Sequence, residues 1–145
     1  MVQGINPEGF WGPHGRGFSQ VVVQPPGRTV HVTGQVAFDA DNRVIAPGDA
    51  LAQARVCFDH CRRVLEFVGA TLDDVVSLTV LYVDPADLPA IQRARSEVYV
   101  TPNAPVSILY QVAGLTEPGL LVEVAPIAVL PEPERPAGGR LENGR

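Results

Sequence analysis

The residue types that most often carry chemistry are few in this chain. Cys57, His60 and Cys61 lie within one short segment, and a Cys-His-Cys grouping suggests a metal site. In a helix, however, Cys57 and Cys61 share a face while His60 lies about 100° away from Cys61. The sequence also has no second Cys or His cluster that could complete four ligands. We therefore expect two core thiols, kept reduced, and no metal.

The other two histidines, His14 and His31, are isolated in the sequence, and neither belongs to a catalytic-triad pattern. The segment 12–17 reads GPHGRG and is rich in glycine. It follows no predicted strand, precedes no predicted helix and lacks the GxGxxG spacing. We expect it to be a flexible entry segment rather than a phosphate-binding loop.

Glu123 is the most informative charged residue, because it interrupts an otherwise apolar strand that reads LLVEVA. Its side chain must face either solvent or a site, and the spacing alone favours solvent. In a desolvated cleft its pKa would rise, and the carboxylate could bind or position a water molecule.

Composition limits the classes of function. A chain of 145 residues, 46% of them hydrophobic, predicts a single globular domain, and no apolar run reaches the roughly 18 residues of a membrane span. The net charge is -5, and the basic residues are scattered, so we expect no nucleic-acid partner. All 11 basic residues are arginine, which excludes lysine Schiff-base chemistry. The N-terminus has no signal-peptide pattern, so we expect a cytoplasmic protein.

The elements that would position these residues can be predicted from hydrophobic periodicity. Residues 19–23 and 29–38 are rich in β-formers and flank a Pro-Pro-Gly turn, which favours a β-hairpin. Asp49 is a candidate N-cap for a helix whose apolar residues recur every three or four positions until Gly69.

The second half of the chain alternates in the same way. Residues 75–83 predict a buried central strand, and residues 84–99 predict a helix in which Leu88, Ile91, Arg95 and Val98 share a side. Residues 106–112 and 120–130 predict two more strands. We treat 1–17 as an N-terminal segment, 18–130 as the domain and 131–145 as a flexible tail.

The resulting order, ββαβαββ, predicts a two-layer α+β domain with two helices on one face of a mixed sheet. We expect the other face to remain partly apolar, through residues that include Val80, Tyr82, Ile108, Tyr110, Val122 and Val124. Such a face is seldom exposed on a monomer, so we expect it to be covered by oligomerisation. A small-molecule site could then form between two subunits.

Several short patterns occur in a characteristic order between about Phe18 and Leu130. They are VTGQ at 32–35, Gly48-Asp49 with Gln53, Gly69-Ala70, Asp74-Val75-Val76 with Thr79 and Asp84, VAGL at 112–115, Pro118-Gly119, Val122-Glu123-Val124 and Ile127-Ala128. In this the chain resembles the Rid (RidA/YjgF-like) family, also called endoribonuclease L-PSP. The resemblance implies a chorismate-mutase-like fold and a homotrimer with three clefts between subunits.

The resemblance also implies an activity and a set of site residues. Archetypal members hydrolyse reactive enamines and imines to a 2-keto acid and ammonia, without metal or cofactor. By position, Glu123 would position the water, Thr33 and Gly34 would line the cleft, and Phe18 would take the place of an aromatic wall. Ser107 stands where the family has a carboxylate-binding arginine, and it would instead donate a neutral hydrogen bond to the substrate, as would Thr33. Tyr110, on the same strand, could also contact the substrate.

The missing arginine leaves the function open between two possibilities. The protein could be a Rid-type hydrolase or deaminase whose small imine, enamine or related substrate is neutral or held differently. It could instead be a non-catalytic, ligand-binding or regulatory trimer of the same fold. Arg93 or Arg95 could reach the cleft from a neighbouring subunit, although both are expected on a solvated helix face. Acidity and the lack of a His pair argue against RNA cleavage.

Overall fold

The longest helix forms where the sequence predicts it. The computed structural model describes residues 2–133, in which helix α1 spans Ala50–Glu66. Asp49 caps this helix, since its carboxylate accepts a hydrogen bond of 3.0 Å from the backbone N–H of Ala52. The buried face of α1 includes Cys57, Phe58, Cys61 and Leu65, so the predicted periodicity is confirmed.

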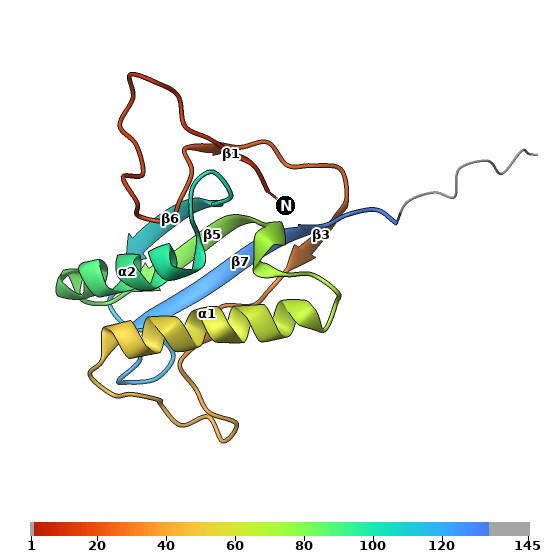
Figure 1. Ribbon diagram of the computed structural model, residues 1–145. Coiled ribbons are helices and arrows are strands. Elements are labelled where there is room, and N and C mark those ends of the chain that lie inside the picture. Colours follow the sequence, from red (N-terminus) through yellow and green to blue (C-terminus); the bar gives the residue numbers. More distant parts are fainter. Residues whose placement is uncertain (1, 134–145) are drawn as a thin grey trace, which may run out of the picture.

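The main sheet is mixed. Its order is β3-β7-β5-β6, with the short strand β4 also paired to β7. The bounds are Arg28–His31 for β3, Gln35–Val36 for β4, Val75–Tyr82 for β5, Val106–Gln111 for β6 and Val122–Leu130 for β7. Strand β5 runs parallel to β6 and antiparallel to β7. Helix α2, at Leu88–Val98, provides the crossover between β5 and β6 (Figure 1).

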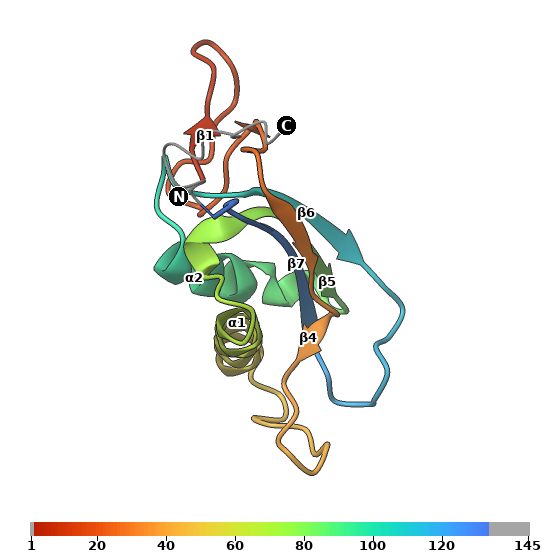
Figure 2. The same ribbon diagram turned by 90° about the vertical axis from the view of Figure 1, so that its right-hand side faces the viewer.

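Both helices lie on one side of this sheet, which leaves the opposite face without a helix (Figure 2). Two short 3-10 segments, Leu72–Asp74 and Pro85–Asp87, precede β5 and α2. The core between the layers joins the helices to Leu78, Val80, Val122 and Val124 of the sheet. This arrangement confirms the predicted two-layer α+β class, with two helices on one face of a mixed sheet.

The uncovered face differs in composition from the expectation. Val80, Val122 and Val124 are fully buried under the helices, and Tyr82 packs against the same core. Because side chains alternate along a strand, their neighbours project from the open face. Ile108 and Tyr110 are 50% and 53% exposed there, so only these two of the six expected residues leave this face apolar.

The predicted N-terminal hairpin is wrong. Strand β2, at Val21–Val22, pairs with β1, at Gly4–Ile5, whereas β3 pairs with β7. At Gly27 the backbone passes so near β7 that an added Cβ would clash with the carbonyl oxygen of Leu130. The chain therefore lies against β7 directly after the turn, where β3 pairs with β7 and not with β2.

The segment before β2 packs against the domain instead of extending from it. Val2 is 3% exposed and its N–H donates a hydrogen bond of 3.0 Å to the carbonyl of Asp73. The predicted tail, 131–145, lies outside the described residues except for 131–133. Among the helices described between residues 2 and 133, none has the length and apolar character needed to cross a membrane.

Candidate functional site

Glu123 projects from the open face of the sheet. Its neighbours on β7, Val122 and Val124, both point into the core under the helices, so the carboxylate between them must point the other way. Across the strands it is opposite Leu81 of β5 and Val36 of β4. Within residues 2–133 its side chain has no hydrogen bond or ion pair.

Gly34 allows the Glu123 carboxylate to lie against the backbone that precedes β4. A Cβ on Gly34 would lie 2.5 Å from Glu123 Oε1 and 2.6 Å from its carboxyl carbon. Thr33 is exposed beside it, and its carbonyl accepts a hydrogen bond of 3.0 Å from Gln35 Nε2. The structure thus brings together three of the predicted site residues, Thr33, Gly34 and Glu123.

Tyr110 lies on the same face as Glu123. Leu81 is the cross-strand partner of both residues, Tyr110 on β6 and Glu123 on β7. Two strand spacings, about 10 Å, therefore separate the backbones of Tyr110 and Glu123. We refer to Thr33, Gly34, Tyr110 and Glu123 together as the carboxylate half-site.

Phe18 and Ser107 belong to a second cluster, on the helix side of the sheet. Ser107 of β6 accepts a hydrogen bond of 2.9 Å from Arg95 Nη1 of α2. Arg95 Nε donates a hydrogen bond of 2.8 Å to the carbonyl of Arg16, and the guanidinium carbon lies 5.2 Å from the centre of the Phe18 ring. We refer to Phe18, Arg95 and Ser107 as the arginine half-site.

The burial of Arg95 corrects the expectation of a solvated helix face. The residue is 2% exposed, whereas Arg93 is exposed and forms an ion pair of 3.5 Å with Glu97. The signal was present in the sequence, since Arg95 shares the apolar side of its helix with Ile91. That stripe faces the sheet, and it carries the guanidinium to the hydroxyl of Ser107.

Arg95 is a buried cation without a carboxylate partner among residues 2–133. Burial lowers its pKa to about 10, and the positive charge of Arg16 adds to the effect. Nη2 has no hydrogen-bond partner in the described part of the chain. Tyr99 Oη is the only completely buried side-chain polar atom without a partner there, so Nη2 retains a small exposed area, although Arg95 as a whole is 2% exposed.

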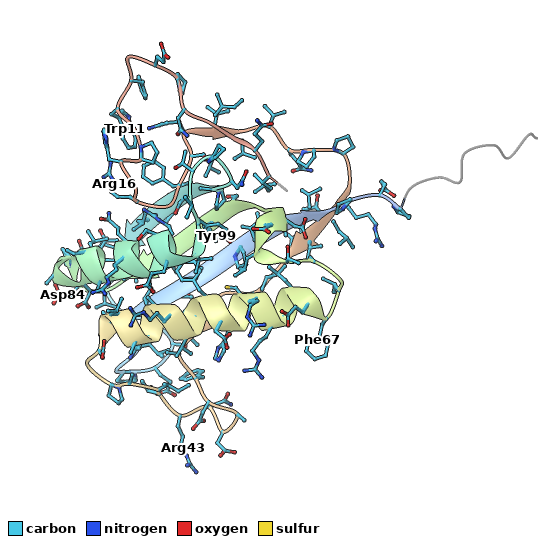
Figure 3. The ribbon with its side chains drawn as sticks, in the orientation of Figure 1. Trp11, Arg16, Arg43, Phe67, Asp84 and Tyr99 are labelled. Carbon is cyan, nitrogen blue, oxygen red and sulfur yellow. The ribbon has the colours of Figure 1, made fainter. Side chains whose placement is uncertain are left out.

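The glycine-rich segment contributes to the same half-site. The Arg16 guanidinium carbon lies 5.4 Å from the centre of the Phe18 ring, and Arg16 donates hydrogen bonds of 3.0 Å to the carbonyls of Pro13 and Gly12. The rings of Trp11 and Phe18 are 5.7 Å apart. Figure 3 shows Trp11 and Arg16 on the loop beyond α2. The carbonyls of segment 12–17 therefore hold the Arg16 guanidinium next to the Phe18 ring.

The two half-sites cannot meet within one chain. The carboxylate half-site projects from the open face, whereas Ser107 faces the helix layer, on the same side as its cross-strand partner Leu78. Strand β5 lies between Ser107 on β6 and Glu123 on β7. A pocket that uses both would need a second copy of the chain.

Cys57 and Cys61 are core thiols, as predicted. Their sulfur atoms contact the carbonyls of Val122 and Val124 at 3.7 and 3.8 Å. Burial raises the pKa of both thiols, that of Cys61 to about 12, which disfavours the reactive thiolate. In the described residues no group of three or more His, Cys, Asp or Glu side chains could hold a metal ion.

A mixed sheet with both helices on one face places the molecule in the chorismate-mutase-like α+β class. The sequence profile named Endoribonuclease L-PSP matches residues 13–130. The chain therefore belongs to the endoribonuclease L-PSP family, which is also known as the Rid family.

Solved structures agree with this assignment. A Rid-family protein of unknown function, YyfB from Yersinia pestis, is 35% identical with a TM-score of 0.82, over 89% of this chain and 98% of that one. RidA from an Antarctic Psychrobacter species is 27% identical with a TM-score of 0.65, over 77% and 89%. A putative endoribonuclease L-PSP from Entamoeba histolytica is 26% identical with a TM-score of 0.64, over 90% and 98%.

Proposed function

We propose that the protein hydrolyses a small imine, or the enamine that tautomerises to it, in a cleft formed between subunits of a homotrimer. Water adds to the imine carbon, and its proton is transferred to the substrate nitrogen through a carboxylate. The C–N bond of the resulting carbinolamine then breaks and releases a carbonyl compound and ammonia. This reaction consumes one water and requires no oxidant and no cofactor.

The observation that carries this proposal is the unpaired carboxylate of Glu123, held against Gly34 on the open face. A general base must be free to accept a proton from water, and no arginine or N–H group of the described residues occupies this carboxylate. In the proposed site Glu123 takes the proton of the attacking water and returns it to the departing nitrogen. Thr33 directly precedes Gly34, and Tyr110 lies on the same face two strands away, so both contribute a hydroxyl group to the carboxylate half-site.

Arg95 supplies the anchoring group that Ser107 cannot. A buried guanidinium without a carboxylate partner is costly, and a substrate carboxylate at Nη2 would compensate its charge. Phe18 would form the wall of this subsite and Ser107 would hold the guanidinium in place. The substrate class is then a 2-imino acid held by a helix arginine instead of a strand arginine.

Joining the two half-sites requires the open face of one subunit to meet the β6 edge of another. The exposed side chains of Ile108 and Tyr110 on the open face support such packing, since a monomer would leave them in water. In the trimer each cleft would combine Glu123 of one copy with Arg95 of the next.

The test of hydrolysis is ammonia release from imines generated in situ by an amino-acid oxidase, measured above the spontaneous rate. We expect the protein to accelerate release and Glu123→Gln to abolish the acceleration. Glu117→Gln, at an exposed loop residue, is the matched control and should leave the rate unchanged. No acceleration with any imine of a broad panel would contradict the proposal.

Anchoring can be measured separately from turnover, with 2-oxobutanoate as a stable analogue of the product. Arg95→Met should weaken its binding by about tenfold to a hundredfold, the effect of losing a charge-assisted contact. Arg93→Met, on the exposed side of α2, should not change it. Binding of 2-oxobutanoate that stabilises the protein, without turnover of any imine, would instead favour the non-catalytic, ligand-binding alternative.

A further inference from the structure

A concave surface lies away from both half-sites, between the second half of α1 and the loop that follows β4. It encloses about 390 Å³ and is lined by Gln35, Phe38, Asp39, Ala40, Ile45, His60, Arg63, Val64 and Phe67. This volume is within the range of small-molecule sites. Gln35 pairs with the buried Val124, so this surface is on the helix side of β4 and Glu123 is on the other. We refer to it as the α1 pocket.

The apolar part of the α1 pocket is left open to solvent. Phe67, which follows the last residue of α1, is 92% exposed, and Val64 is 40% exposed one turn earlier. Figure 3 shows Phe67 at this end of the helix. Phe38 and Ile45 provide the opposite wall. Large apolar side chains gathered at one hollow are a feature of binding sites more than of ordinary surface.

The loop that forms this wall has a defined conformation. Ile45 N–H donates a hydrogen bond of 2.8 Å to the carbonyl of Ala37, and Phe38 forms an isolated β-bridge with Val44. At its turn, Asp39 Oδ1 accepts hydrogen bonds of 2.9 Å from the N–H groups of Asp41 and Arg43. One oxygen of the Asp39 carboxylate, Oδ1, is thereby bound within its own turn, and the wall is preformed.

The polar part of the α1 pocket contains an available cation. Arg62 holds both acidic residues nearby on its helix, Asp59 and Glu66, each at 2.7 Å. Arg63 has no ion pair or side-chain hydrogen bond among residues 2–133, so its guanidinium is free to bind an anion. His60 Nδ1 lies 3.1 Å from the carbonyl of Val36, so this nitrogen carries a proton and Nε2 remains available.

We propose that the α1 pocket binds a small carboxylic acid with an aromatic or branched apolar body. The carboxylate pairs with the Arg63 fork, and the body lies between Phe67 and Phe38. An uncharged apolar ligand would form no ion pair with Arg63, and a small inorganic anion would leave the Phe67 ring exposed to water. This site is separate from the proposed catalytic cleft and does not depend on its activity.

The test is a titration of the full chain with phenylacetate, followed by amide chemical shifts. We expect saturable shifts at residues of the α1 pocket, and about tenfold weaker binding in Arg63→Gln. Phenylacetamide lacks the negative charge. Its affinity for the wild type should therefore be as low as the affinity of phenylacetate for Arg63→Gln. Arg28→Gln, at another exposed arginine that forms no ion pair within residues 2–133, is the control and should bind normally. Phe67→Ala removes an exposed ring and should lose affinity without loss of folding.

Several outcomes would overturn this proposal. They are no saturation below about 10 mM, equal binding of phenylacetate and phenylacetamide, or an equal loss of affinity in Arg28→Gln. Shifts at the same residues on simple dilution would show that another copy of the chain covers the pocket. Phenylacetate binding should persist in Glu123→Gln, because the α1 pocket does not include Glu123. Failure of the α1-pocket proposal can therefore be distinguished from failure of the proposed hydrolase function.

Discussion

The Arg95 guanidinium of α2 donates a hydrogen bond of 2.9 Å to the hydroxyl of Ser107 on β6. Ser107 is the residue that the sequence comparison predicts at the place of the family's carboxylate-binding arginine. A guanidinium is therefore present beside this position, but it reaches it from the helix layer. We propose that this guanidinium binds the substrate carboxylate in place of a strand arginine; among residues 2–133 it is a buried cation without a carboxylate partner.

The contact between Arg95 and Ser107 predicts what happens when the guanidinium is moved from the helix to the strand. Arg95→Met should lose 2-oxobutanoate binding, and the double variant Arg95→Met with Ser107→Arg should recover part of it by returning the guanidinium to the strand. Ser107→Arg alone places two like charges together and should lower the melting temperature. Calorimetry and thermal denaturation of the three variants measure these effects. A double variant that binds no better than Arg95→Met would argue against Arg95 as the anchor.

A methyl group at Gly34 should lower the catalytic rate with little effect on the stability of the fold. In Gly34→Ala the new Cβ would meet the end of the Glu123 side chain, which can swing aside, so folding should be largely retained. The displaced carboxylate should lower kcat by about tenfold or more. Gly114→Ala is the control, because no atom lies within 4 Å of its added Cβ. Unchanged kcat in Gly34→Ala would contradict the role given to Glu123.

The two thiols should resist alkylation in the folded protein. Burial raises the pKa of Cys61 to about 12 and that of Cys57 further, so both remain protonated near neutral pH. Iodoacetamide should therefore modify neither cysteine in native buffer and both in denaturant, as read by intact mass. Rapid labelling of the native protein would show that the helix layer opens far more readily than its packing suggests.

The stability that the Arg55–Glu97 ion pair between the two helices contributes should depend on pH. Arg55 donates hydrogen bonds of 2.9 and 2.7 Å to Glu97, and this guanidinium lowers the pKa of the carboxyl below its ordinary value of 4.5. A lowered carboxyl pKa stabilises the folded state above the unfolded pKa, and the contribution is lost as the pH falls through the folded pKa. The stability difference between wild type and Glu97→Gln should therefore shrink from about pH 5 to about pH 3. A constant difference would exclude this ion pair as its source.

Local patterns in the sequence predict most of the fold, because α1, β5 and β7 each have a strong periodicity of their own. The hairpin prediction fails because β-formers do not identify their partner strand. The partner of β2 is the glycine-containing β1, which has little strand signal. The solvated position expected for Arg95 is wrong for a different reason, since its place on the apolar side of α2 decides its burial despite its charge. The near contact of Gly34 with Glu123 joins segments far apart in the chain, and no local pattern indicates it.

In the proposed trimer, Glu123 of one subunit and Arg95 of the next act in one cleft. The decisive experiment mixes Glu123→Gln and Arg95→Met chains one to one, reassembles them and measures ammonia release from the imine. Each variant alone should be inactive or nearly so, whereas random trimers should regain about a quarter of the wild-type rate, from clefts that receive both intact residues. A mixture no more active than the separate variants would place both residues in the same chain's site, or in no shared site, and would contradict the account.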